Sequence, residues 1–172
     1  MTDADLTGVK YLVGGPMRSL FWNGNFSAVE RERVEMVVSS LRALGATVFN
    51  AHEAENYAAA AITSEMVTLR DHDWVRRCDI YLALWPAKNG TPVPSTGTAV
   101  EIGWASMLNK SIVVAGSMSC LASYGHLIRG IGALTRFEFL DDAQGVESIV
   151  HRARDLGIKL KSRDGVSVDD GR

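Results

Sequence analysis

The sequence predicts a single α/β domain built on a mostly parallel five-stranded sheet with helices on both faces. Short apolar runs suited to buried strands alternate with longer amphipathic segments, and Gly, Pro, Ser or Thr residues separate them. This order is typical of doubly wound domains of the Rossmann-like or flavodoxin-like kind. The expected strands are residues 10–13, 47–49, 80–85, 111–115 and 136–140, and the expected helices are residues 29–44, 62–77, 98–108 and 146–156.

The first half of the chain contains clear element ends. The apolar run at 10–13 stops at two glycines and a proline, as a buried strand does before a loop. Apolar residues recur at helical spacing through 29–44, and Gly45 follows directly as a C-terminal stop. Residues 47–49 (TVF) then form a second short strand. The chain is therefore expected to begin with a strand, a helix and a strand.

The second half repeats the alternation. Residues 62–77 have Thr63 or Ser64 near their start and two arginines in the last turn, which favours a helix. Residues 80–85 (IYLALW) are continuously apolar, as expected of a central parallel strand. The remaining elements follow the same alternation: a helix at 98–108, strands at 111–115 and 136–140, and a helix at 146–156.

Composition limits the classes of function. The 172 residues are 47% hydrophobic and 22% charged, with a formal net charge of −2, which is typical of a soluble globular protein. The sequence has no basic block for nucleic acid and no apolar run near the ~20 residues that span a membrane. An acidic N-terminus without a signal-peptide pattern predicts a cytoplasmic protein. We expect one catalytic domain over 1–160 and a polar, flexible tail over 161–172.

The cysteines and histidines form no metal-binding pattern. Cys78 and Cys120 are far apart in the sequence and are expected to be buried thiols. The four histidines lack paired spacings such as H-x-x-x-H, so neither a metal ion nor another cofactor is expected.

Three loops are expected to border one crevice, because doubly wound sheets bind ligands at the carboxyl ends of their strands. These loops contain residues 14–18, 50–52 and 85–98. In the first loop, glycines allow a close backbone approach, and Arg18 offers a permanent positive charge. That combination suits a phosphate group, although a tight turn with a solvated arginine is an equal alternative.

Glu101 is the candidate for chemistry. Ser, Thr and Gly residues precede the helix at 98–108, and their hydroxyl and N–H groups are expected to face the crevice. Glu101 is expected in the first turn of this helix, among small or apolar neighbours. Thr98 and Glu101 also have the spacing of a capping box, so a purely structural carboxylate is the alternative.

Four separated motifs resemble the nucleoside 2-deoxyribosyltransferase superfamily. They are 14–18 (GGPMR), 49–52 (FNAH), 71–73 (DHD) and 95–106 (STGTAVEIGWAS), within a similarity over roughly residues 10–140. The last motif contains the family block Gly-x-x-x-Glu-[Ile/Leu]-Gly-[Tyr/Trp]-Ala. The nearest resemblance is to nucleoside 5′-monophosphate N-glycosidases, in particular the cytidylate and hydroxymethylcytidylate hydrolases of nucleoside-antibiotic biosynthesis.

The resemblance implies a role for each matching residue. Glu101 would be the nucleophile that forms a covalent glycosyl intermediate, as in a retaining glycosidase. Asp71 would help the leaving base accept a proton. The implied substrate-binding residues are Gly15, Arg18, Asn50, His52, Tyr57, Ser95, Gly97 and Thr98. Among them, Arg18 would contact a phosphate, and Tyr57 would stack on the base.

Ser95, six residues before Glu101, favours a nucleotide substrate. The resemblance implies an aspartate here in transferases, where it holds a 5′-hydroxyl, and a serine in monophosphate hydrolases. A carboxylate would repel a phosphate dianion, whereas a hydroxyl can donate to it. We therefore expect hydrolysis of a CMP-like nucleoside 5′-monophosphate to free base and (deoxy)ribose 5-phosphate. Base exchange between deoxynucleosides and non-catalytic nucleotide sensing are the alternatives.

Two positions depart from the family pattern. Leu12 stands where an aromatic residue would contact the sugar and the nucleophile, and Tyr11 would point to the opposite face. The choices of base and of ribose or 2′-deoxyribose therefore stay open. Gly125 stands where related hydrolases receive a serine from a neighbouring subunit, in a homodimer or larger homo-oligomer with shared active sites. The candidate replacements are Ser117, Ser119 and Ser123.

Overall fold

The computed structural model describes residues 5–58 and 63–164. One five-stranded sheet runs in the order β4-β1-β5-β8-β9, and every neighbouring pair is parallel. Its strands are β1 (Lys10–Gly14), β4 (Thr47–Asn50), β5 (Ile80–Leu84), β8 (Ser111–Gly116) and β9 (Phe137–Asp141). The predicted doubly wound α/β fold is confirmed. Strand order reverses at β1, which has β4 on one side and β5 on the other.

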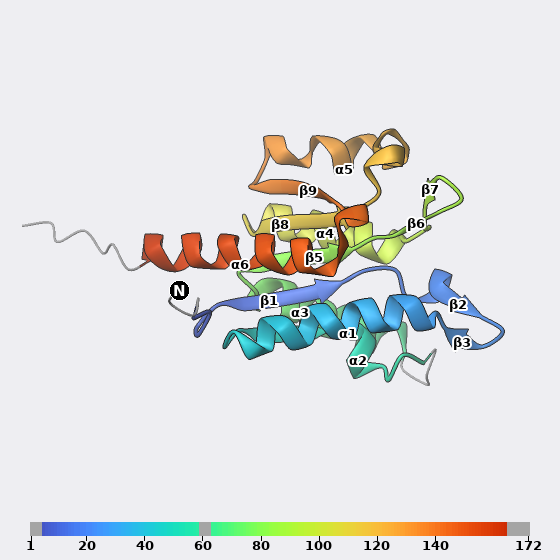
Figure 1. Ribbon diagram of the computed structural model, residues 1–172, viewed down its shortest axis with the longest axis horizontal. Helices are drawn as coiled ribbons and strands as arrows, with labels where there is room; N and C mark the ends of the chain where they lie inside the picture. The colour runs from blue at the N-terminus through green and yellow to red at the C-terminus, as the bar shows by residue number, and fades with distance from the viewer. Residues whose placement is uncertain (1–4, 59–62, 165–172) are drawn as a thin grey trace, which may run out of the picture.

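Helices cover both faces of the sheet (Figure 1). α1 (Ala28–Ala43) and α6 (Gly145–Asp164) lie along one face, where their apolar side chains share one buried cluster with Tyr11 and Val13 of β1. On the other face, α3 (Ser64–Arg77), α4 (Thr96–Met107) and the short α5 (His126–Gly130) bury a second cluster. The sheet thus separates an α1/α6 cluster from an α3/α4 cluster.

Local signals in the sequence explain where the helices begin and end. Ser27 caps α1 by accepting from the backbone N–H of Glu30, and Gly45 follows the helix with a φ of 89°. Thr63 caps α3 by accepting from the backbone N–H of Met66. The predicted stop at Gly45 is therefore confirmed, and Thr63, expected near the start of the helix predicted over 62–77, is its N-cap. Residue 62, included in the predicted helix, lies outside the described residues.

Most predicted boundaries differ from the structure by one residue, and the start of α4 and the end of α6 differ by more. α4 begins at Thr96, two residues before the expected start, because Ser95 is its N-cap. α6 continues to Asp164, so the tail expected from residue 161 begins inside a helix. The rest of that tail, 165–172, lies outside the described residues.

The sequence did not predict several short elements. They are η1 (Arg18–Leu20), β2 (Phe21–Trp22), β3 (Asn25–Phe26), α2 (Ala51–Ala54), β6 (Ala87–Lys88), β7 (Thr91–Pro92), η2 (Met118–Ser123), η3 (Ile131–Ala133) and η4 (Asp142–Gln144).

Two Asn-Gly hairpins project beyond the carboxyl ends of the strands (Figure 1). β2 and β3 join through Asn23-Gly24, and β6 and β7 join through Asn89-Gly90. All four turn residues have positive φ, as type I′ hairpin turns require. Lys88 Nζ lies 5.5 Å from the centroid of the Trp22 ring, so the hairpins contact each other.

Both cysteines are buried free thiols, as predicted. Each Sγ donates to a backbone carbonyl oxygen three residues earlier. Among the helices in 5–58 and 63–164, none combines the length and the apolar character needed to cross a bilayer.

Candidate active site

The predicted nucleophile, Glu101, lies in the second turn of α4. The helix begins at Thr96 because Ser95 has an extended backbone and its Oγ accepts from the Thr98 backbone N–H at 3.3 Å. The capping box suggested by Thr98 and Glu101 is therefore wrong, and so is the placement of Glu101 in the first turn. The Glu101 carboxylate is consequently not used to cap its own helix.

Glu101 instead contacts a side chain of the sheet. The hydroxyl of Tyr81, on β5, donates to Oε2 of Glu101 at 2.5 Å. Tyr81 is completely buried. A Cβ atom at Gly14 would lie 2.8 Å from the Tyr81 hydroxyl oxygen and 3.2 Å from Oε2 of Glu101. The glycine at the end of β1 therefore provides the space that this pair occupies.

The environment of Glu101 changes its acidity. The pKa of Glu101 is raised to about 8, mainly by burial and also by the negative charge of Asp71. The hydrogen bond from Tyr81 acts in the opposite direction, because it favours the ionised carboxylate. A carboxyl group in this range exchanges its proton near neutral pH, as groups in acid–base and nucleophilic catalysis do.

Asp71, the predicted proton donor, is a buried residue of α3. Its Oδ1 accepts a 2.8 Å hydrogen bond from Nε of Arg70. The same guanidinium donates from Nη2 to Oε1 of Glu55 at 2.7 Å. Burial raises the pKa of Asp71, and the charge of Arg70 opposes the shift. Arg70 and Glu55 were not predicted, because a single arginine or glutamate carries no distinguishing pattern in the sequence.

The predicted phosphate end lies beside the start of α4. Arg18 is exposed at the beginning of η1, in the loop after β1. The next residue, Ser19, donates from Oγ to the carbonyl oxygen of Pro94 at 2.5 Å. This contact joins the loop that carries Arg18 to the segment that ends at Ser95. The structure thus brings two predicted phosphate-binding residues to neighbouring loops.

Ser95 and Thr98 share a second contact. Their hydroxyl oxygens lie 2.7 Å apart, and either can be the donor. When Thr98 supplies the hydrogen, the hydroxyl of Ser95 is free to donate elsewhere. Gly97 is exposed in the first turn, whereas the backbone N–H of Thr98 already donates to Ser95. Of the backbone N–H groups of Gly97 and Thr98, that of Thr98 is therefore used by the helix cap.

Three other predicted binding residues hold the loops that follow β1 and β4. A Cβ atom at Gly15 would lie 2.3 Å from the carbonyl oxygen of Leu84, so only glycine allows this approach. Asn50 donates from Nδ2 to a carbonyl oxygen of β1 at 2.9 Å, and its Oδ1 caps α2. His52 is 2% exposed, with Nε2 3.1 Å from the carbonyl oxygen of Pro16. Their contact with substrate stays a prediction.

The ring of Tyr57, which was predicted to stack on the base, is buried in the structure. Tyr57 belongs to the α1/α6 cluster, on the other face of the sheet from Tyr81. The Arg31 guanidinium lies 4.6 Å from its ring centroid, and the rings of Phe26 and His52 pack against it at 5.5 and 6.2 Å. These contacts cover the ring, which is 8% exposed, so no face is open for a base to stack.

The structure also shows where the two positions that depart from the family pattern, Leu12 and Gly125, lie. Leu12 faces the α3/α4 cluster, whereas Tyr11 lies in the α1/α6 cluster and donates to the carbonyl oxygen of Ala153 at 2.8 Å. Tyr11 therefore points away from Glu101, as strand alternation predicted. Gly125 precedes α5 as its N-cap. Which serine replaces it, if a neighbouring subunit contributes one, stays a prediction.

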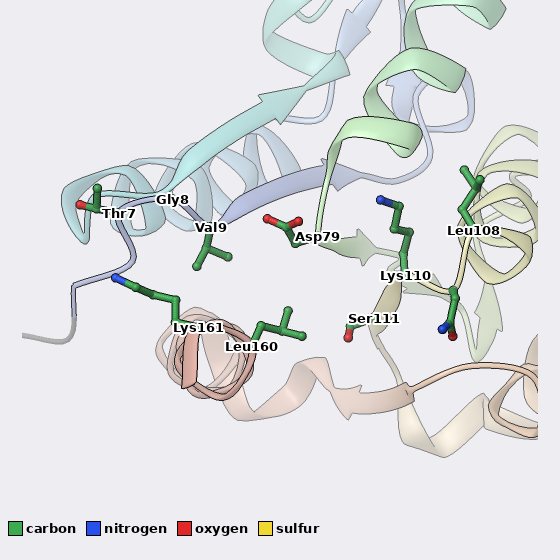
Figure 2. A pocket seen from close by; sticks show the side chains of 10 residues that line it. Thr7, Gly8, Val9, Asp79, Leu108, Lys110, Ser111, Leu160 and Lys161 are labelled. Atoms are coloured by element: carbon green, nitrogen blue, oxygen red, sulfur yellow. The ribbon is translucent and has the colours of Figure 1, made fainter. Parts of the chain in front are cut away.

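A cavity of about 530 Å³ lies at the opposite edge of the sheet (Figure 2). Asp79, Lys110 and Lys161 border it, at the amino ends of the strands. Lys110 donates to the carbonyl oxygen of Arg76, and Lys161 is paired with Asp5. Parallel doubly wound sheets bind substrates at the carboxyl edge, so this cavity is separate from the candidate active site.

The fold and the site define an α/β protein with a parallel sheet and an enclosed carboxylate, Glu101, between Tyr81 of β5 and Gly14 at the end of β1. The chain belongs to the nucleoside 2-deoxyribosyltransferase family, whose model matches residues 23–128. This membership supports a reaction at an N-glycosidic bond, either base transfer or hydrolysis. A comparison with curated proteins gave no match.

Solved structures share the fold. The solution structure of BlsM is 26% identical, covers 94% of this chain and 97% of its own, and has a TM-score of 0.72. The CMP N-glycosidase BcmB of Clostridium botulinum is 22% identical over 86% of this chain and 98% of its own, with a TM-score of 0.57. A 2-deoxyribosyltransferase from Bacillus psychrosaccharolyticus is 19% identical over 83% of this chain and 90% of its own, with a TM-score of 0.54.

Proposed function

We propose that the protein hydrolyses the N-glycosidic bond of a nucleoside 5′-monophosphate through a covalent intermediate on Glu101. The observation that carries this proposal is the Glu101 carboxylate, which is held by Tyr81 and lies close enough to Asp71 for the two charges to interact. Two carboxyl groups in different environments are the usual equipment for glycoside hydrolysis with retention. A CMP-like nucleotide is the favoured substrate, by resemblance.

The first step forms the glycosyl-enzyme. An ionised oxygen of Glu101 bonds to C1′ while the C1′–N bond breaks and its electron pair moves to the base. Asp71, in its protonated form, gives its proton to the leaving base. Protonation of Asp71 also removes the negative charge that helps to raise the pKa of Glu101. A protonated Asp71 therefore favours the ionised Glu101 that the first step needs.

The second step releases the sugar phosphate. A water molecule bonds to C1′, the bond between C1′ and Glu101 breaks, and its electron pair returns to the carboxylate. The ionised Asp71 accepts the proton that the water loses. The products are the free base and (deoxy)ribose 5-phosphate, and both carboxyl groups return to their initial states.

The 5′-phosphate is proposed to bind between the loop after β1 and the start of α4. Arg18 would supply a positive charge, and Ser95 and the backbone N–H of Gly97 would supply hydrogen bonds. The contact between Ser19 and Pro94 supports this arrangement, because it fixes one loop against the other. A serine at position 95 also avoids the repulsion that a carboxylate would exert on a phosphate.

The test is incubation with a panel of ribo- and deoxyribonucleosides and their 5′-monophosphates, followed by chromatographic separation of free bases. We expect base release from monophosphates, loss of release in Glu101→Gln, and full activity in the control Glu35→Gln, an exposed carboxylate of α1. Release that requires an added second base would support transfer instead. Tight nucleotide binding without base release would support a sensor.

A further inference from the structure

The position of Tyr81 in the sheet explains how its hydroxyl reaches Glu101. In the parallel pairing of β1 and β5, Tyr81 is the register partner of Leu12, and both face the α3/α4 cluster. Register partners on neighbouring strands lie side by side, about 4.8 Å apart, at the same height along the sheet. The hydroxyl of Tyr81 can therefore reach the same space that an aromatic side chain in place of Leu12 would face.

The two oxygens of the Glu101 carboxylate have different surroundings. Oε2 is enclosed between the hydroxyl of Tyr81, at 2.5 Å, and Gly14, where a Cβ atom would lie 3.2 Å away. Within residues 5–58 and 63–164, no hydrogen bond to Oε1 was found. One oxygen is thus anchored, and the other is left for a reacting atom.

We propose that Tyr81 is the positioning residue for the nucleophile: its hydroxyl fixes Oε2 of Glu101 so that Oε1 attacks C1′. This inference rests on the proposed function. A hydrogen bond to a carboxylate is stronger than one between neutral groups, and it restricts rotation of the carboxylate plane. Reaction rates depend steeply on such alignment, because a displacement of about 1 Å can reduce the rate about 100-fold.

The hydroxyl of Tyr81 stays a donor throughout the working pH range. Complete burial and the neighbouring charge of Glu101 raise the pKa of Tyr81 far above its usual value. The same bond favours the ionised form of Glu101, which is the form that attacks C1′. Tyr81 thereby takes over, from β5, the contact that Leu12 is unable to make from β1.

Tyr11 provides a matched control within the same sheet. It is also completely buried, lies next to Leu12 on β1, and uses its hydroxyl in one hydrogen bond, to the carbonyl oxygen of Ala153. Its ring faces the α1/α6 cluster, on the opposite side from Glu101. Tyr11→Phe and Tyr81→Phe therefore remove the same group at the same burial, and only the second removes it from Glu101.

The experiment compares these two variants by kinetics and by titration. Tyr81→Phe is expected to lower kcat about 10- to 100-fold with KM within about 2-fold of wild type, because alignment rather than binding is lost. Carboxyl-labelled ¹³C NMR, assigned with Glu101→Gln, is expected to show that Glu101 titrates at higher pH in Tyr81→Phe. Tyr11→Phe should leave both kcat and this titration unchanged.

A second variant keeps the test decisive if Tyr81→Phe is poorly folded. Gly14→Ala places a methyl group against the hydroxyl of Tyr81 and Oε2 of Glu101, and should likewise lower kcat. Gly132→Ala, where the added atom meets only an ordinary contact at 3.6 Å, is its control. An unmoved Glu101 titration and wild-type kcat in Tyr81→Phe would overturn the proposal. If wild type cleaves no nucleotide, the proposed function fails, while the NMR titration still tests the Tyr81 contact.

Discussion

The hydroxyl of Ser19 donates to the carbonyl oxygen of Pro94, and this bond fixes the loop after β1 against the segment before α4. The two halves of the proposed phosphate site, Arg18 on one side and Ser95 on the other, thereby belong to one connected edge. Neither half lies on a strand, and this contact joins the two segments directly.

Arg18→Ala should weaken the enzyme selectively toward nucleotides. A charge-assisted contact to phosphate contributes about 1.5–3 kcal/mol, so kcat/KM for the monophosphate should fall roughly 10- to 100-fold. The kcat/KM for the matching nucleoside should be unchanged. Arg77→Ala, which removes an exposed arginine paired with Asp73, is the control. Equal losses for nucleotide and nucleoside would contradict a phosphate contact.

Ser95→Asp should shift preference from the nucleotide toward the nucleoside. Like charges ~4 Å apart cost about 4 kcal/mol at an effective dielectric of 20, so the new carboxylate should repel the 5′-phosphate. Aspartate caps helices as well as serine does, and the start of α4 should be preserved. The measurement is the ratio of kcat/KM for monophosphate to that for nucleoside. Ser95→Asn, an equally good but neutral cap, should change this ratio far less. An unchanged ratio in Ser95→Asp would show that residue 95 does not face the 5′ end.

Asp71→Asn should slow cleavage most for bases that are poor leaving groups. An amide is unable to supply the proton, and removal of general acid catalysis costs about 10²- to 10⁴-fold. The loss should be much smaller for p-nitrophenyl ribose 5-phosphate, whose leaving group needs no proton. Asp73→Asn removes an exposed carboxylate two residues along the same helix and should be nearly neutral. The same loss on both substrates would argue against proton donation.

Glu101→Gln should stabilise the protein at high pH. The pKa of Glu101 is raised to about 8 in the folded protein. The folded state therefore loses stability as the pH rises from the pKa of Glu101 in the unfolded chain toward 8. Each pKa unit corresponds to about 1.4 kcal/mol, and we expect a gain on the order of 1–3 kcal/mol at pH 9. Near pH 4 the gain should be small, because below the usual pKa of 4.5 both the folded and the unfolded state keep the proton. Urea unfolding at the two pH values measures the difference, and a pH-independent effect would contradict this assignment.

The protein should form a homodimer or a larger homo-oligomer. Leu69 on α3 and Met107 on α4 are 71% and 82% exposed, on helices that pack side by side. Exposed apolar side chains gathered on one face are typical of subunit interfaces. Light scattering at micromolar concentration should give a mass above that of one chain, and Leu69→Glu with Met107→Glu should lower it. Met36→Glu, on the other face of the sheet, should not. A fully active wild-type monomer would refute the prediction.

The fold was predictable from the sequence because apolar periodicity and terminating glycines report local structure directly. The start of α4 was misplaced because both Ser95 and Thr98 suit an N-cap, and only the backbone conformation decides between them. The hairpins were missed because each strand has two residues, too few for a periodic pattern. Their Asn-Gly turns were nevertheless a readable signal.

The site was only partly predictable, because its contacts depend on neighbours distant in sequence. Glu101 was found from its motif. Tyr81 was not, since within a continuous apolar run a tyrosine gives no indication that its hydroxyl is used. Its role becomes visible only through the pairing of β1 with β5. The burial of the Tyr57 ring was not predictable, because its contact with Arg31 depends on the packing of α1.

The two hairpins at the carboxyl edge tolerate sequence change more readily than the five-stranded sheet does. Their four strands contribute no hydrogen bond to the five-stranded sheet, and their turns close by the local geometry of Asn-Gly pairs. Phe26 of β3 belongs to the buried α1/α6 cluster, so changes confined to the Asn-Gly turns should leave the sheet and the anchoring of Glu101 intact. Exchange of these short segments between homologues is a practical route to enzymes that share one reaction centre and differ in what borders its entrance.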